Sequence, residues 1–245
     1  MKLFLKNLIG VIGACAALCG IALMLYALSS YVSSIVTSNP QSVNKDESKK
    51  ITVVLDAGHG GIDGGAVGVS GSLEKDLNLS IVKKTKERLE SLGVTVVLTR
   101  ESDLLPDDGG EGSRKSKDLR QRVRVVADTP NAILVSVHMN RFPESAVKGM
   151  TFYYSPNHPD SYRLAKLMHE RLLATLQSEN KRPMKEASGN IYLLYHTAAP
   201  AVLVECGFLS NPEEEALLGT EVYQDKIAAL FAESILAYIN EKESP

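Results

Sequence analysis

From residue 51 onward, short β-branched runs alternate with stretches in which apolar residues recur at intervals of three and four. The first pattern predicts buried strands and the second predicts amphipathic helices. Strands are expected at Ile51–Leu55, Val94–Thr99, Ala132–His138, Met150–Ser155, Asn190–Tyr195 and Ala201–Phe208. Helices are expected from about Glu74 to Leu92 and at Asp118–Asp128, Pro159–Gln177 and Val222–Ile239. This order of β-α repeats predicts one α/β domain.

The apolar pattern is different before residue 29. Residues 8–28 form an uncharged apolar run, long enough to span a bilayer, which takes about 20 residues. Lys2 and Lys6 before it predict that the N-terminus is cytoplasmic and that the rest of the chain is extracytoplasmic. We therefore expect a signal anchor or signal peptide at residues 1–31, with the length favouring the anchor. A flexible linker is expected at 32–50 and a folded domain at 51–242.

Charge and cysteine content narrow the class of protein. The 27 Lys and Arg residues nearly balance 29 Asp and Glu residues, giving a formal net charge of -2. This balance gives no indication of a nucleic-acid-binding protein. Cys15 and Cys19 lie in the N-terminal apolar run, which leaves Cys206 without a partner for a disulfide within the folded domain. That domain must then depend on its core, or on a metal.

The loop after the first strand, Asp56–Gly65, consists largely of glycine and contains one histidine, His59. Its glycine spacing fits neither a dinucleotide-binding fingerprint nor a P-loop, so a phosphate cradle is rejected. Two interpretations remain: a tight turn with an incidental histidine, or a metal site with His59 as one ligand. The metal site requires other ligand-type residues at the same edge of the sheet.

Three further residues of that kind are expected at this edge. Glu74 lies at or just before the start of a helix, where it could also be a favourable charge on the helix dipole. His138 ends the strand from Ala132. Glu205 follows four apolar strand residues, and a carboxylate there is costly to bury unless it is paired or binds a metal. Cys206 beside it could suggest a nucleophile, but a small cysteine more often fills a core.

Together these residues predict a hydrolytic zinc site. Two imidazoles and one carboxylate, with an open fourth position, form a catalytic zinc ligand set, and the remaining carboxylate can act as a base. Zinc lowers the pKa of water to about 7, which favours attack on a carbonyl. We expect Glu205 to move the proton to the leaving amine and Asp56 to orient a ligating histidine. The absence of an H-E-x-x-H motif excludes a thermolysin-type site.

Other polar residues near this edge are expected to contact the substrate. Arg100 and Asn140 each follow a strand, and the planar fork of arginine binds carboxylates well. Three arginines, Arg120, Arg122 and Arg124, lie on the short basic helix that follows. We expect two of the three to face solvent.

Five segments resemble the zinc-dependent N-acetylmuramoyl-L-alanine amidases of the Amidase_3 type. They are Asp56-Ala-Gly-His-Gly-Gly61, Leu73-Glu-Lys-Asp76, Leu119-x-x-Arg122, Ser136-Val-His-Met-Asn140 and Pro200–Asn211. The resemblance extends over about Ile51–Glu241 in the same order. It implies a single α/β domain with a mixed, mostly parallel six-stranded sheet and helices on both faces. It also implies cleavage of the amide between muramic acid and the L-alanine of the stem peptide in peptidoglycan.

By motif matching, the resemblance implies that His59, Glu74 and His138 bind Zn²⁺ and that Glu205 is catalytic. Within the family, the N-terminal anchor, the loop after Arg100 and the segment from Asn190 most resemble the germination-specific (CwlD-type) amidases of spore formers. Such enzymes remove stem peptides from the spore cortex before muramic lactam forms. The implied location is the spore intermembrane space, and an activating protein partner is a further expectation.

The chain also departs from the family pattern. Ala57 stands where proline is usual, and Met139 and Arg141 flank Asn140 where small residues are usual. Some relatives carry a helical plug after the His138 strand, whereas the short Arg141–Gly149 connection, with a proline inside, predicts none. Two alternative functions remain: a zinc peptidase that cuts within the stem peptide, and a non-enzymatic wall-binding module.

Overall fold

A computed structural model of the protein describes residues 23–30 and 50–243. The chain divides into two compact units, Met1–Glu47 and Ser48–Pro245. Residues 23–30 are helical, and most of the expected anchor and linker lies outside the described residues. Within the parts of the chain that the structure describes, no helix is both long and apolar enough to cross a membrane.

The second unit is built on a six-stranded mixed sheet, which confirms the expected architecture. Its strands follow the order β2-β1-β3-β6-β4-β5. Only β4 and β6 pair in antiparallel fashion, and the other neighbours are parallel. The strands are β1 (Thr52–Ala57), β2 (Thr95–Leu98), β3 (Ala132–Asn140), β4 (Thr151–Tyr154), β5 (Lys185–Glu186) and β6 (Ala201–Phe208).

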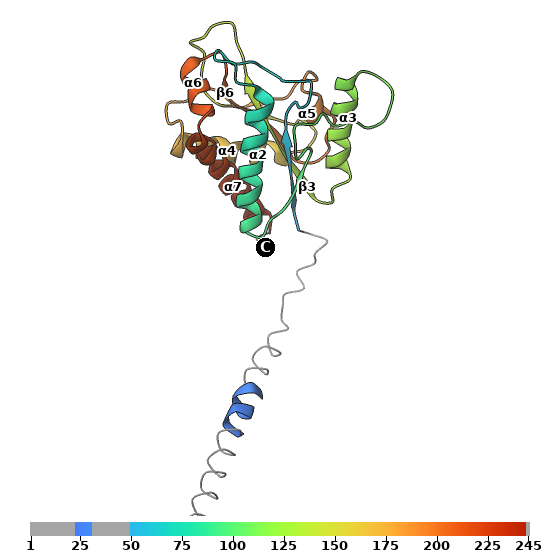
Figure 1. Cartoon of the computed structure of the whole chain (residues 1–245), viewed down its shortest axis with the longest axis vertical. Helices are drawn as coiled ribbons and strands as arrows, with labels where there is room; N and C mark the ends of the chain where they lie inside the picture. Colours follow the sequence, from blue (N-terminus) through green and yellow to red (C-terminus); the bar gives the residue numbers. More distant parts are fainter. Residues whose placement is uncertain (1–22, 31–49, 244–245) are drawn as a thin grey trace, which may run out of the picture. The chain divides into compact units, whose positions relative to one another are not determined.

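Helices cover both faces of the sheet (Figure 1). One face packs against α2 (Glu74–Ser91), α4 (Asp160–Thr175) and α7 (Glu221–Glu243). The other face packs against α3 (Arg114–Ala127) and the short α5 (Tyr192–His196). A further short helix, α6 (Pro212–Leu218), follows β6 closely. As predicted, α2 begins at Glu74, and Gly93 with φ of 80° follows its end.

Strand alternation decides which side chains can meet. Successive side chains point to opposite faces, so Leu203 belongs to the core under α3 and α5 while Val204 belongs to the core under α2, α4 and α7. Glu205 therefore shares the α3–α5 face with Leu203. Cys206 points to the opposite face, where it is 1% exposed within the apolar core. This placement supports the interpretation of Cys206 as a core residue.

Several predicted boundaries were wrong. The segment expected as a strand at Asn190–Tyr195 forms α5, in which the consecutive residues Leu193 and Leu194 are both buried, contrary to strand alternation. Helix α3 begins four residues before Asp118, because the Ser113 hydroxyl accepts a hydrogen bond from the Ser116 amide and caps the helix. The two-residue β5 and the helix α6 were not predicted.

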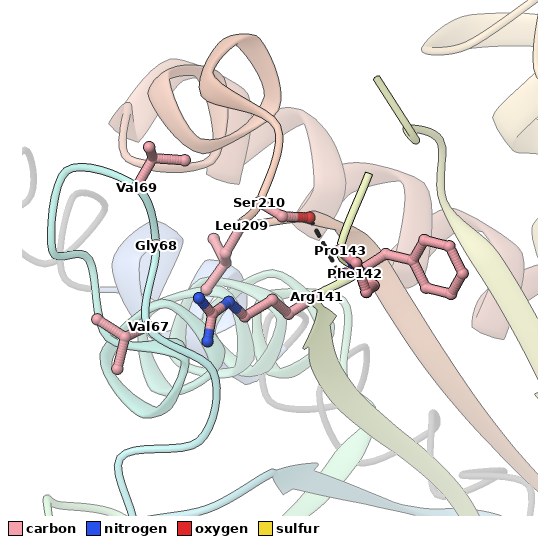
Figure 2. A pocket seen from close by; sticks show the side chains of 8 residues that line it. All are labelled: Val67, Gly68, Val69, Arg141, Phe142, Pro143, Leu209 and Ser210. Carbon is pink, nitrogen blue, oxygen red and sulfur yellow. Dashed lines mark hydrogen bonds between the residues drawn. The ribbon is translucent and has the colours of Figure 1, made fainter. Parts of the chain in front are cut away.

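Three connections gather at the carboxyl edge of the parallel strands: residues 58–73, 141–150 and 209–211. Parts of all three line a cavity of about 510 Å³ (Figure 2). Its lining residues are 67–69, 141–143, 209 and 210. Residues 141–150 contain no helix. This edge of the sheet is where ligands bind in open α/β folds.

Candidate functional site

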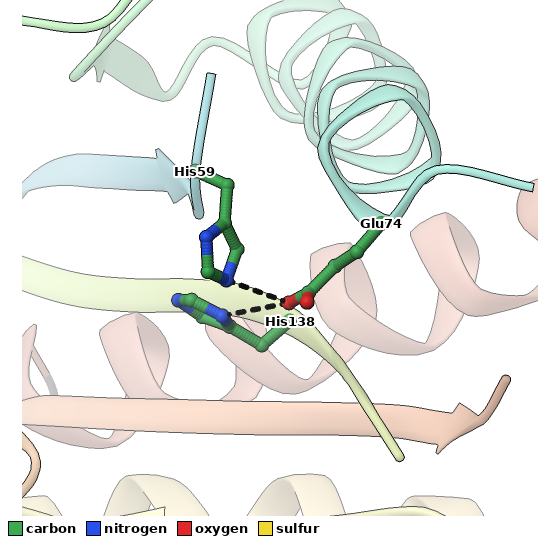
Figure 3. A group of neighbouring side chains, drawn as sticks. All are labelled: His59, Glu74 and His138. Atoms are coloured by element: carbon green, nitrogen blue, oxygen red, sulfur yellow. Dashed lines mark hydrogen bonds and ion pairs between the residues drawn. The ribbon is translucent and has the colours of Figure 1, made fainter. Parts of the chain in front are cut away.

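Two histidines and one carboxylate converge at the carboxyl edge (Figure 3). One oxygen of Glu74, Oε1, lies 3.2 Å from His59 Nε2 and 2.9 Å from His138 Nδ1. One ligand-type atom from each residue can be chosen so that all lie within 4.8 Å of one another. The side chain of Glu74 is 4% exposed, whereas those of His59 and His138 are 20% and 21% exposed. The cluster is therefore anchored on its buried side and open on its other side.

Each of these residues is placed by a different element. His59 lies just beyond β1, Glu74 is the first residue of α2, and His138 lies near the end of β3. The Glu74 carboxylate accepts hydrogen bonds from two backbone amides, 2.7 Å from Ala66 N to Oε2 and 3.0 Å from Met139 N to Oε1. These bonds fix the carboxylate between the loop after β1 and the end of β3.

The backbone at His59 adopts an unusual conformation. Its φ is 61°, in the left-handed region that non-glycine residues seldom adopt. A tight turn holds it, with reciprocal backbone bonds between Gly60 and Asp63 of 2.9 and 3.0 Å. The Arg122 guanidinium also donates to the His59 carbonyl at 2.7 Å. Such strain persists only where the surroundings impose it, and here it directs the imidazole toward Glu74.

The electrostatics of the cluster favour a positive charge. Burial lowers the pKa of His59, but the carboxylates of Glu74 and Asp63 outweigh burial and raise it to about 9. Burial likewise raises the pKa of Glu74, but the two imidazoles hold it well below its usual range. Asp63 Oδ2 lies 3.0 Å from His59 Nδ1. Two imidazoles and one carboxylate with ligand atoms within 4.8 Å of one another form a donor set that fits zinc.

Glu205 lies beside this cluster on the same face of the sheet. Its Cα is paired in register with that of His138 across β3 and β6. Burial raises the pKa of Glu205 to about 7, with His138 opposing the rise, and its Oε2 is buried without a hydrogen-bond partner. Both residues line a cavity of about 220 Å³, together with His59 and Asp63. An unpaired carboxylate beside the candidate ligand cluster is well placed to accept a proton.

Glycine is required at position 58 for this geometry. A Cβ at Gly58 would lie 2.2 Å from Cε1 of His138 and 2.3 Å from its Nε2. The backbone of the β1 loop therefore approaches the imidazole more closely than any side chain would allow.

The chain matches the family described as N-acetylmuramoyl-L-alanine amidase over residues 53–237. The chain belongs to this amidase family. A relative in Bacillus subtilis (strain 168), the germination-specific N-acetylmuramoyl-L-alanine amidase, is 38% identical over 196 residues. The match covers 79% of this chain and 81% of the relative. The enzyme AmiA of Escherichia coli (strain K12) is 28% identical, with 83% and 82% of the two chains covered.

Solved structures of relatives share the fold of this amidase. The CwlD amidase of Clostridioides difficile, solved in complex with the GerS lipoprotein, has a TM-score of 0.73 and 38% identity. The match covers 78% of this chain and 98% of that one. The catalytic domain of CwlV from Bacillus (Paenibacillus) polymyxa var. colistinus has a TM-score of 0.68 and 34% identity, with coverage of 78% and 98%.

Among the described hydrogen bonds of Asp56 none joins its carboxylate to a histidine, so the predicted orientation of a histidine by Asp56 would be indirect. Its buried carboxylate accepts hydrogen bonds from Thr99 at 2.6 Å, Ser136 at 2.5 Å and Arg122 at 2.5 Å. Burial raises the pKa of Asp56, but Arg122 and the other partners lower it to about 2. Asp56 thus holds Arg122, and Arg122 in turn holds the backbone of His59. The carboxylate that contacts the imidazole is Asp63, a residue that the sequence did not single out.

The environment of Arg100 contradicts its predicted contact with substrate. The residue is 5% exposed, and its guanidinium donates to backbone carbonyls of Ala57, Gly58, Lys75 and Ser102. These bonds tie the β1 loop to the start of α2, so the side chain is not available to a ligand. Strand position alone could not reveal this, because the same fork that binds carboxylates also binds carbonyls.

The other residues singled out in the sequence, Asn140 and the three arginines of α3, differ in burial and in bonding partners. Asn140 is half-buried at the end of β3, with its Oδ1 accepting from the Arg141 amide at 2.8 Å. Of the three arginines on α3, Arg122 is buried, Arg120 pairs with Asp108, and Arg124 is exposed. The metal-side cavity also has lining residues that were missed, and they come from α3 and the region of α5. They include Lys115, Leu119, Asn190, Ile191, Tyr192 and Leu193.

Proposed function

We propose that this amidase is a zinc-dependent hydrolase that cleaves the amide between the lactyl group of muramic acid and the L-alanine of the stem peptide. His59, Glu74 and His138 would hold the metal, and Glu205 would be the catalytic carboxylate. The observation that carries this proposal is the convergence of the three ligand-type side chains within 4.8 Å, next to a carboxylate in register with His138.

Each residue of the site has a separate role in the proposed reaction. Zinc, when bound, supplies a Lewis acid and lowers the pKa of water to about 7. Glu205 accepts the proton of the attacking water and returns it to the leaving amine, and burial raises its pKa to about 7. Asp63 orients the imidazole of His59 through its contact with Nδ1. Asn140, beside the cluster, is proposed to contact the substrate.

Substitutions test the two classes of residue separately. His59→Ala and His138→Ala should each remove metal and activity together, as measured by elemental analysis and product release. Glu205→Gln should keep the metal and lose about 10²–10⁴-fold in kcat, the usual contribution of a positioned base. A Glu205→Gln variant that lost its metal would show that Glu205 is a ligand instead. Full metal content in both histidine variants would refute the ligand assignment.

The bond cleaved is tested by mass spectrometry of digested peptidoglycan. Free lactyl groups and intact stems are expected from an amidase. Shortened stems would instead identify a peptidase, which is the second enzymatic candidate because both bonds are amides. No cleavage by the zinc-loaded protein would favour a wall-binding module.

We also propose a role in spore cortex maturation, outside the cytoplasm and in the intermembrane space. The support is the 38% identity to the germination-specific amidase of Bacillus subtilis. The chain should restore muramic lactam to the cortex of a spore former that lacks its own germination-specific amidase. Cortex without lactam, in spores that contain the active protein, would contradict this role.

An activating protein partner and a membrane anchor belong to the same proposal. The support for a partner is the CwlD amidase of Clostridioides difficile, which was solved with a lipoprotein. The apolar run of residues 8–28 supports the anchor. Affinity purification of the full chain from sporulating cells, with separation of soluble and membrane fractions, tests both. A full chain that is soluble and isolated without a partner would count against them.

A further inference from the structure

Arg141 carries an uncompensated charge at the rim of the larger cavity. Its guanidinium extends between Val67 and Leu209 (Figure 2). Among residues 50–243, none forms an ion pair or a hydrogen bond with this guanidinium, although the Arg141 backbone amide is bonded. A free guanidinium in a cavity of about 510 Å³ has both the charge and the room to bind an anion.

The walls of this cavity are fixed by hydrogen bonds to the segment that follows β6. Leu209 N donates to Asn140 O at 2.8 Å, and Phe142 N donates to Ser210 Oγ at 3.0 Å. On the other side, Val69 N donates to Leu209 O at 3.2 Å. Both walls are therefore hydrogen-bonded to residues 209 and 210, and the cavity is formed before any ligand binds.

A buried carboxylate from α6 anchors the wall formed by residues 67–69. Glu215 accepts hydrogen bonds from the amides of Ser70, at 2.9 Å, and Ser72, at 3.3 Å. A Cβ at Gly68 would lie 2.0 Å from Glu215 Oε1, so a larger residue there would require the Glu215 carboxylate to shift. Glu215 is thus occupied by backbone amides and leaves Arg141 without a carboxylate.

Residues next to the cavity lining are hydrogen-bonded to Glu74 of the candidate metal site. Ala66, next to Val67, and Met139, two residues before Arg141, donate their amides to the two oxygens of Glu74. Arg141 lies three residues beyond His138, a distance of at most about 10 Å at about 3.3 Å per residue. An extended peptide covers that distance in about three residues.

We propose that this cavity is a subsite for the stem peptide, in which Arg141 binds a peptide carboxylate two or three residues from the scissile amide. The inference rests on the proposed amidase function. The exposed apolar side chains of Val67 (46%), Val69 (63%) and Phe142 (49%) provide contact for the peptide backbone and aliphatic groups. The guanidinium of Arg141 favours a peptide that carries a negative charge. Arg141 is therefore a specificity residue and takes no part in the chemistry.

The experiment compares wild type and Arg141→Ala on two substrates. One substrate is an N-acetylmuramoyl peptide with free side-chain carboxylates, and the other is the same compound with those groups as carboxamides. Arg141→Ala should lower kcat/KM for the carboxylate substrate by about 10-fold or more, mainly through KM, because the variant loses a charge-assisted hydrogen bond to the substrate. It should leave the carboxamide substrate unchanged, and Arg141→Lys should recover part of the loss.

Arg88→Ala provides the matched control, since Arg88 is an exposed arginine near the far end of α2 from Glu74. Binding of the free stem peptide, measured by calorimetry, gives a readout that does not require turnover. Arg141→Ala should weaken this binding and Arg88→Ala should not. An equal loss on both substrates, or unchanged peptide binding, would overturn the subsite. If the wild type cleaved neither substrate but bound the peptide through Arg141, the proposed amidase function would fail and the subsite would stand.

Discussion

At the scale of single residues, His59 combines a strained backbone with a strongly perturbed side chain. Its left-handed conformation is held by the Gly60–Asp63 turn and by Arg122. Its pKa is raised because Glu74 and Asp63 both contact the ring. On the proposed function, a bound cation would take the place of the proton on this ring.

Asp63→Asn should lower zinc affinity by about 10–100-fold, the usual effect of removing a carboxylate that orients a ligating histidine. Competition with a chromophoric chelator measures this directly. Glu101→Gln is the matched control, because Glu101 is an acidic residue whose side chain is 77% exposed. Equal zinc affinity in wild type and Asp63→Asn would show that the turn alone positions His59.

Acid should destabilise the domain through Asp56. Its folded-state pKa of about 2 lies below the ordinary value of 3.8 for an aspartate, so its stabilisation is present above pH 4 and is lost as pH falls toward 2. The shift corresponds to about 2 kcal/mol. Urea unfolding of wild type and Asp56→Asn across this range should therefore give a steeper loss for wild type. Parallel curves for the two proteins would contradict the assignment.

The sequence was informative about residues that mark element ends and less so about side-chain partners. His59, Glu74, His138 and Glu205 could be located because strand ends and helix starts meet at one edge of a parallel sheet. The partners of Asp56 and Arg100 could not be located, because they depend on which face of the sheet each side chain occupies and on loops that are distant in the sequence. Asp63 was missed because its role arises from a turn four residues long.

At the scale of elements, α3 is joined to the β1 loop by a buried ion-pair network. Arg122 bonds to Asp118 on its own helix, to Asp56 on β1 and to the carbonyls of Ala57 and His59. Its side chain is 2% exposed. The helix therefore supports the candidate metal site through its position, although none of the candidate ligands lies on it.

Arg122→Ala should lower the free energy of unfolding by about 3–5 kcal/mol, because it leaves Asp56 buried without its cation. Denaturant unfolding measures the loss. Arg124→Ala, an exposed arginine two positions away on the same helix, should stay within about 0.5 kcal/mol of wild type. Similar losses in the two variants would mean that the network is not the main source of the effect.

The elements that could be predicted were those with long, clear periodicity. α2, α4, α7 and β6 agree with expectation to within a few residues. The segment at α5 could not be assigned, because a five-residue apolar run fits a strand or a helix equally well. The start of α3 was missed because its first turn is polar and has only a serine cap to mark it.

At the scale of the whole molecule, the candidate site lies entirely within the unit that begins at Ser48. The connection between β3 and β4 is short and contains no helix, so it offers no plug for the site.

The fragment from Lys50 onward should hydrolyse peptidoglycan when zinc is added. Zinc titration and dye-release assays on this fragment measure loading and activity separately. An inactive fragment with zinc bound, restored by deleting a segment outside residues 141–149, would reveal an inhibitory element elsewhere in the chain.

The three candidate ligands come from distant points of the chain, positions 59, 74 and 138. A bound ion would therefore act as a cross-link that closes two loops of the chain and reduces the freedom of partly opened states. We expect chelation to speed hydrogen–deuterium exchange in residues 58–73 and at the end of β3, and to leave the amides of α4 and α7 unchanged. Uniform acceleration throughout the domain would mean that the ion stabilises the fold as a whole. The location of the faster exchange thus distinguishes an ion that stabilises only the loops around it from an ion that stabilises the entire fold.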